Sequence, residues 1–108
     1  MSELKELIAK AKQKDLKAMG ELFNKFKPLV KSRAKKYSRC GLEYDDVFQQ
    51  GALLFIIGVY EHQAEKERSP TAFSGYIKKR LDWGLWMYYR KYLKQKIEIA
   101  SGLKPKEI

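Results

Sequence analysis

The stretch Gly75–Lys96, GYIKKRLDWGLWMYYRKYLKQK, places two tryptophans and four tyrosines among seven lysines and arginines. At about 100° per residue, the large residues in and just before it fall on two faces of one helix. One face is predicted to lie in the core and carries Phe73, Ile77, Leu81, Leu85, Tyr88 and Tyr92. The second stripe is roughly opposite, is predicted to be exposed, and carries Lys79, Trp83, Trp86 and Arg90.

Two exposed tryptophans between cations favour contact with single-stranded or melted nucleic acid. Aromatic rings stack on bases with about 1–3 kcal/mol each, and nearby cations hold the phosphates. The alternative is that the N-terminal helix or a partner protein covers this stripe. Gly84 is predicted to allow close approach of a neighbouring helix, and Asp82 is predicted to pair with Lys78 on its own helix.

The remaining sequence predicts three further helices and no strand alternation. We expect a short helix at about residues 2–14, a helix that begins after the N-cap Asp15 and ends before Gly41, and a helix capped by Asp45 or Asp46. The last helix is expected over about residues 71–98, after a polar loop. The third segment is apolar nearly all round and is predicted to be the most buried. The fold class is therefore all-α, a single-domain bundle of about four helices, divided into a short N-terminal helix (1–14), a helical domain (15–98) and a tail (99–108).

Composition narrows the function classes. Lys and Arg number 23 against 13 Asp and Glu, a formal charge of +10, which favours an anionic partner. One cysteine and one histidine allow neither an intrachain disulfide nor a Cys/His zinc site. No nucleophile–base pair or metal set is present, so we expect no enzyme activity, no cofactor and no metal. No apolar run reaches the ~20 residues of a membrane span, and a cytoplasmic protein is expected.

Three stretches, taken in order, resemble region 2 of bacterial sigma factors. KDLKAMGELFNKFKPLVKSRAKKY resembles its opening helix, with an aromatic–x–Pro–Leu–Val step at residues 26–30. YDDVFQQGALLFIIGVY resembles the next helix, whose core is Asp–Leu–x–Gln–Glu–Gly; here Gln50 stands in place of the glutamate. FSGYIKKRLDWGLWMYY resembles the helix that melts and reads the minus-ten element. The family's adjacent tryptophans are absent, because Lys79 and Arg80 occupy those positions.

The resemblance implies a partner and a surface for each of two helices. The stretch YDDVFQQGALLFIIGVY implies docking on the clamp of the largest subunit of core RNA polymerase, through Asp45, Asp46, Gln49 and Gln50. From the residues alone, the two aspartates instead only cap the helix and the glutamines face solvent. The last of the three resembling stretches, FSGYIKKRLDWGLWMYY, implies contact with minus-ten promoter DNA. Together with the stripe described above, the DNA-binding candidates are Tyr76, Lys78, Lys79, Arg80, Trp83, Trp86, Arg90 and Lys91.

The sequence thus predicts a transcription initiation factor-like protein that binds core RNA polymerase and promoter DNA. Two alternatives stay open: a stand-alone nucleic-acid-binding helical module, and a protein-interaction co-regulator of transcription that does not melt DNA. The chain resembles a region 2 domain without region 4. That is expected of one half of a two-part sigma factor, whose region 4 a separate protein supplies, of a phage or mobile-element regulator, or of a fragment of a longer chain. The promoter sequence and the oligomeric state are left open.

Overall fold

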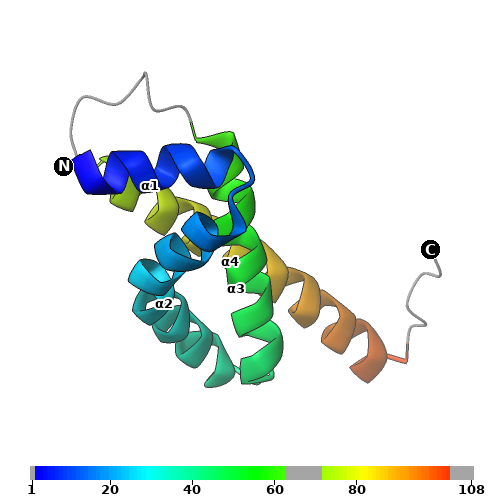
Figure 1. The fold of residues 1–108 in the computed structure, drawn as a ribbon. Coiled ribbons are helices and arrows are strands. Elements are labelled where there is room, and N and C mark those ends of the chain that lie inside the picture. The colour runs from blue at the N-terminus through cyan, green and yellow to red at the C-terminus, as the bar shows by residue number, and fades with distance from the viewer. Residues whose placement is uncertain (1, 63–71, 103–108) are drawn as a thin grey trace.

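Four helices make up the described part of the chain, which comprises residues 2–62 and 72–102 of the computed structural model (Figure 1). They are α1 (Ser2–Lys12), α2 (Leu16–Ser38), α3 (Tyr44–Glu61) and α4 (Ala72–Ala100). No strand occurs among these residues, so the all-α fold class is confirmed. None of the helices described is both long enough and apolar enough to cross a membrane.

The turn between α1 and α2 fixes α1 across one end of the bundle (Figure 1). Lys14 adopts a positive φ of 67°, and the Asp15 carboxylate accepts hydrogen bonds from the backbone N–H groups of Lys17 and Ala18. Asp15 is therefore the N-cap that the sequence predicts. Ile8 and Ala11 of α1 are buried in the main hydrophobic core. At the C-terminal end of α1, beside this turn, the Lys12 ammonium donates a hydrogen bond to the backbone carbonyl of His62.

The core lies between α2, α3 and the first half of α4, and α3 packs against all three other helices. Phenylalanine rings fill its centre: Phe55 of α3 lies 5.5 Å from both Phe23 and Phe26 of α2, measured between ring centroids. Phe26 in turn lies 5.5 Å from Phe73 of α4, edge to face. Edge-to-face contacts of this kind add stability beyond the burial of apolar area. The third helix, predicted to be the most buried, shares the central position with α2, which also packs against all three other helices and runs unbroken through Pro28.

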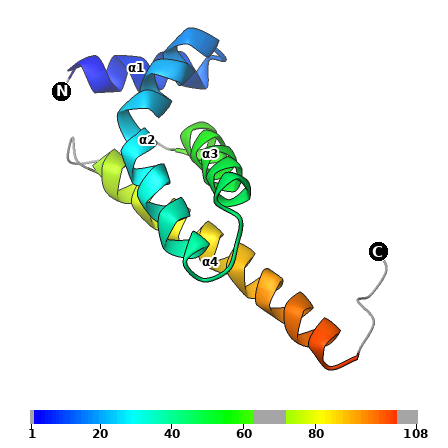
Figure 2. The same cartoon turned by 90° about the horizontal axis from the view of Figure 1, so that it is seen from below.

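The structure confirms both the buried and the exposed face predicted for the last helix. Phe73, Ile77, Leu81 and Leu85 are fully buried, and Tyr88 and Tyr92 are partly buried against a second cluster around Tyr37 and Leu42. The C-terminal part of α4 extends beyond α2 and α3 (Figure 2) and ends at Ala100, two residues later than predicted. The expected start of this helix at about residue 71 lies outside the described residues.

Gly84 allows α3 and α4 to approach closely, as the sequence predicts. A Cβ built on Gly84 would lie 2.6 Å from both terminal methyl carbons of Leu54 and 3.1 Å from its Cγ. No side chain larger than a hydrogen fits there unless Leu54 or the helix axes move. The missing Cβ therefore fixes the separation of the two helices beside the buried residues Leu81 and Leu85.

We predict that Gly84→Ala destabilises the domain relative to Gly75→Ala. Both changes raise helix propensity by about 1 kcal/mol, and a Cβ at Gly75 meets nothing within 4 Å. The difference between the two variants thus isolates the clash with Leu54. Overpacking of this kind costs about 1–3 kcal/mol. Urea unfolding followed by circular dichroism measures the difference, and equal free energies of unfolding would show that the contact is not tight.

Candidate functional site

The outer stripe of α4 carries the two tryptophans in the open. The side chains of Trp83 and Trp86 are 67% and 45% exposed, and Lys79 and Arg90 beside them are exposed. Neither α1 nor any other described segment covers them. A monomeric protein rarely leaves two neighbouring tryptophans in solvent, so the stripe has the character of a binding surface.

One of the two acidic residues of α4, Asp82, is paired with a cation of α2. Asp82 Oδ1 accepts a hydrogen bond from Arg33 Nε of α2 at 2.5 Å, and the two form an ion pair. The predicted pairing with Lys78 is wrong, because Asp82 lies on the side of α4 that packs against α2. Burial raises the pKa of the neighbouring Tyr37 phenol, and the Asp82 carboxylate raises it further. The partnership with Arg33 leaves the exposed stripe of α4 with cations and aromatic rings.

Two of the predicted DNA-binding residues are engaged at the start of α4. Tyr76 is partly buried, and its ring lies 5.2 Å from that of His62 at the end of α3. The Arg80 guanidinium lies 2.6 Å from the Glu61 carboxylate. The structure therefore places both beside the C-terminal end of α3. Lys78, Lys79 and Lys91 are exposed and carry no ion pair among the described residues.

The predicted docking residues lie together at the start of α3. Asp45, Asp46 and Gln49 are exposed and Gln50 is partly buried. The predicted capping role of the aspartates is wrong: the N-cap position belongs to Glu43, and both aspartates lie inside the first turn. They still interact favourably with the positive end of the helix dipole. Among the described residues, no group of His, Cys, Asp or Glu side chains is placed to hold a metal ion.

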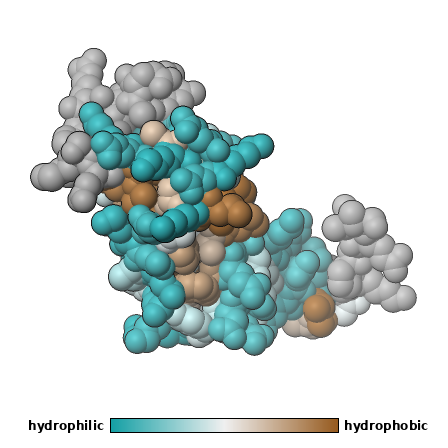
Figure 3. Space-filling model, viewed as in Figure 1, coloured by the Kyte–Doolittle hydropathy of each residue, from teal (hydrophilic) through white to brown (hydrophobic). Residues whose placement is uncertain are grey.

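The exposed side of α3 continues as apolar surface, which sequence reasoning missed. Leu53, Ile56 and Tyr60 are 50%, 36% and 41% exposed. At about 100° per residue they fall within the same arc of the helix as Asp45, Asp46 and Gln49. We call this set of six residues the outer face of α3. Figure 3 shows apolar side chains over the upper part of α3 and hydrophilic ones toward its lower end. All three apolar residues belong to the segment that was predicted to be the most buried.

The docking candidate Gln50 of α3 adjoins the stripe of α4. A shallow groove runs along the C-terminal half of α4, and Gln50 lines it together with Gly84, Trp86 and Met87. Further along, the groove is lined by Tyr88, Arg90, Lys91, Leu93, Lys94, Ile97 and Glu98. Met87 is 44% exposed. Leu93 and Ile97 repeat the helical spacing of Trp86, a signal present in the sequence but not used in the prediction.

Comparison with models of known protein families identifies the family of this chain. Residues 22–81 match the model of the family described as Sigma-70 region 2, which is more than half of the chain. The chain belongs to the sigma-70 region 2 family. Neither the curated proteins nor the solved structures contain a match to it. The recognition of a sigma region 2-like domain from the sequence is confirmed, and membership indicates a sigma-factor-like role in transcription initiation.

The matched range includes one of the two surfaces whole and, of the stripe of α4, Lys79 alone. It contains all of α3, and so the whole outer face with Asp45, Asp46 and Gln49. It ends at Leu81, before Trp83 and Trp86. Sigma-70 region 2 domains generally bind core RNA polymerase and promoter DNA. The two tryptophans of the stripe are features of this chain beyond the segment that the family model matches.

We predict a measurable coupling between Arg33 and Asp82. A partly exposed ion pair contributes about 0.2–1 kcal/mol, so a double-mutant cycle of Arg33→Gln and Asp82→Asn should give a coupling in this range. It should shrink in about 1 M salt, because screening weakens the attraction. The matched cycle of Lys78→Gln with Asp82→Asn should give no coupling. Coupling in the Lys78 cycle instead would contradict the arrangement of α2 and α4.

Proposed function

We propose that this domain acts in transcription initiation by binding core RNA polymerase through the outer face of α3 and promoter DNA through the exposed stripe of α4. It works by binding, with no chemical step of its own. Membership of the sigma-70 region 2 family supports the role. The single observation that carries the proposal is that the docking and DNA-binding candidates form two adjoining exposed surfaces in the folded chain.

The outer face of α3 has the composition of a protein interface. Its first half offers two carboxylates and an amide, and its second half offers Leu53, Ile56 and Tyr60. An apolar centre with polar groups at its edge is the usual anatomy of a protein–protein contact. The resemblance to region 2 assigns this helix to the clamp of the polymerase's largest subunit. Exposed aspartates give such a contact an electrostatic part that weakens with salt.

The stripe of α4 suits DNA whose bases are accessible. Trp83 and Trp86 present flat rings for stacking, and Lys79, Arg90 and Lys91 present cations for phosphates. Arg80 is held by Glu61, and Tyr76 is partly covered, so their contribution requires local rearrangement at the end of α3. Minus-ten promoter DNA is the target that the family implies. The tryptophans therefore carry most of the expected base contact.

The two surfaces are placed to act together. Gln50 belongs to the docking set, yet it lines the same groove as Trp86. A polymerase subunit seated on the start of α3 therefore comes close to the tryptophan stripe. DNA bound to the stripe then lies beside the polymerase as well as the domain. Binding to one raises the effective concentration of the DNA at the other.

The test of docking is capture of purified core RNA polymerase by the immobilised protein. Asp46→Arg with Gln49→Ala should abolish capture, because the change reverses a charge and truncates an amide on the outer face. The matched control, Glu6→Arg with Gln13→Ala, makes equivalent changes at exposed positions of α1 and of the turn that follows it, and should leave capture unchanged. Circular dichroism checks that both variants fold.

The outcomes separate docking from general loss of function. Capture by the wild type and the α1 control, with loss in the α3 variant, supports the proposed docking surface. Equal capture by all three proteins would move the polymerase contact away from the outer face of α3. No capture by the folded wild type at low salt would overturn the docking proposal altogether.

Stacking on α4 can be read directly, because Trp83 and Trp86 are the two tryptophans of the chain. Single-stranded DNA should quench their fluorescence, and an abasic strand of equal length and charge should not. Trp83→Ala with Trp86→Ala should weaken single-strand binding by about 1–3 kcal/mol per stacked base while leaving its salt dependence nearly unchanged. Equal quenching by the abasic strand would contradict base stacking.

A further inference from the structure

The outward face of α2 is a second concentration of positive charge that the proposed function does not use. The segment 24–39 contains seven cations and no acid. The cations are Lys25, Lys27, Lys31, Arg33, Lys35, Lys36 and Arg39. A run without a single carboxylate leaves the local field uncompensated, so this side of the helix attracts anions.

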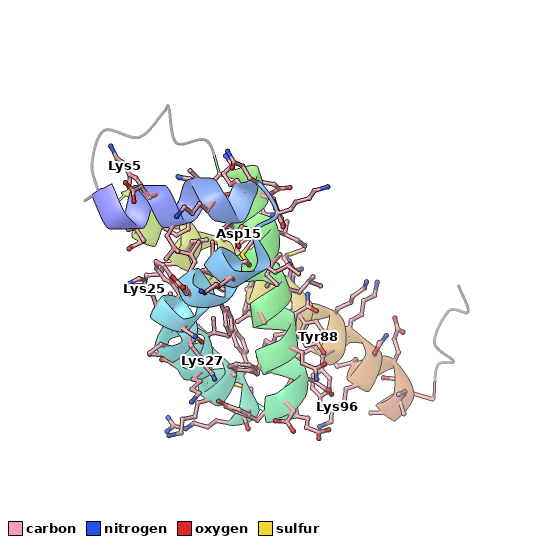
Figure 4. The ribbon with its side chains drawn as sticks, viewed as in Figure 1. Lys5, Asp15, Lys25, Lys27, Tyr88 and Lys96 are labelled. Carbon is pink, nitrogen blue, oxygen red and sulfur yellow. The ribbon has the colours of Figure 1, made fainter. Side chains whose placement is uncertain are left out.

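Six of the seven cations are available to a ligand. Arg33 is engaged by Asp82, whereas the other six form no ion pair among the described residues. All six are exposed except Lys27, which is partly buried. Lys36 lies 5.6 Å from the centre of the Tyr37 ring. Figure 4 shows Lys25 on the side of α2 that is turned away from α3.

The cations follow a line. Lys27, Lys31, Lys35 and Arg39 recur every four residues, so successive Cα atoms rise by about 6 Å and the series extends about 18 Å along the helix. A compact anion needs its cations converging on one point. A line of point charges instead matches a polyanion that repeats along its length, such as a nucleic-acid strand.

This face presents no exposed aromatic ring on which a base could stack. Its exposed residues between the cations are Asn24, Pro28 and Ser32, and the aromatic residues of the segment, Phe26 and Tyr37, are partly or fully buried. Lysine ammonium groups bind phosphate as point charges. The contact is therefore expected to be with the backbone, independent of base sequence. It differs in kind from the stripe of α4, where tryptophans supply stacking.

The α2 face is also distinct from α4 in space. Arg33 points toward α4, as its ion pair with Asp82 requires. Lys31 and Lys35 are each two residues from Arg33, about 200° around the helix. Both therefore point away from the side on which α4 packs. A strand bound to this face does not run over Trp83 and Trp86.

We propose that the outward face of α2 is a second nucleic-acid contact, which binds the phosphodiester backbone through Lys27, Lys31, Lys35 and Arg39. It goes beyond the proposed function, since it requires neither polymerase nor the tryptophans. In a transcription complex this face holds a segment of nucleic acid other than the one stacked on α4. The phosphodiester backbone of duplex DNA, single-stranded DNA and RNA supplies the same chemistry, and the test distinguishes them.

The experiment compares two variants that each remove two exposed lysines. Lys31→Gln with Lys35→Gln alters the α2 face, and Lys5→Gln with Lys10→Gln is the matched control on α1. Glutamine keeps high helix propensity, so both should fold. Fluorescence anisotropy measures the affinity of each protein for labelled duplex DNA, single-stranded DNA and RNA between 50 and 200 mM salt.

Each lost phosphate contact should lower the slope of log K against log salt by about 0.9 for duplex DNA and about 0.7 for single strands. The α2 variant should therefore lose about 2 from the duplex slope, and its affinity deficit should be about tenfold larger at 50 mM than at 200 mM salt. The α1 control should keep the wild-type slope. The probe that shows the largest change identifies the nucleic acid that this face prefers.

Three results would overturn the proposal. They are equal slopes for the α2 variant and the α1 control, no measurable binding of any probe by the wild type at 50 mM salt, and loss of polymerase capture by the α2 variant with unchanged slopes. The last would identify the face as a protein contact. A smaller slope of log K against log salt in the α2 variant would support the α2 contact on its own. It would do so even if Trp83→Ala with Trp86→Ala left single-strand affinity unchanged and base stacking on α4 were contradicted.

Discussion

The close approach of α3 and α4 at Gly84 determines which side of α4 meets solvent. The Leu54 side chain occupies the space that a Cβ at Gly84 would fill, so the glycine side of α4 packs closely against α3 in this setting. In that setting Leu81 and Leu85 enter the core, and the tryptophans on either side of Gly84 face outward. The Arg33–Asp82 pair restrains α4 from the side of α2. The binding stripe is a consequence of this packing.

Features set by the local helix period were predictable from the sequence. The buried and exposed sides of α4 follow from residue spacing, and the capping role of Asp15 follows from its place before an apolar run. Features set by a neighbouring helix were not. Asp82 has a cation one turn away on its own helix, yet it pairs with Arg33, 49 positions away along the chain. The choice depends on how α2 and α4 cross, which no local pattern encodes.

The same reasoning explains the uneven prediction of the candidate site. An apolar helix such as α3 gives little periodic contrast, so the exposure of Leu53, Ile56 and Tyr60 depends on where the bundle stops. Tyr76 and Arg80 match the family pattern, but the end of α3 supplies them with His62 and Glu61 as partners. The tryptophans lie past the segment that the family model matches. Their position was found from residue spacing alone.

The distribution of charge over the surface fits the proposed partners. The chain has 23 basic and 13 acidic residues, yet Glu43, Asp45 and Asp46 stand exposed together at the start of α3. Nucleic acid is repelled from that position and attracted to α4 and to the outward face of α2. In the proposed complex, a protein partner at α3 therefore meets no competition from DNA. Because Gln50 lines the groove of α4, the acidic position would also favour a bound strand that runs along α4 over one that crosses α3.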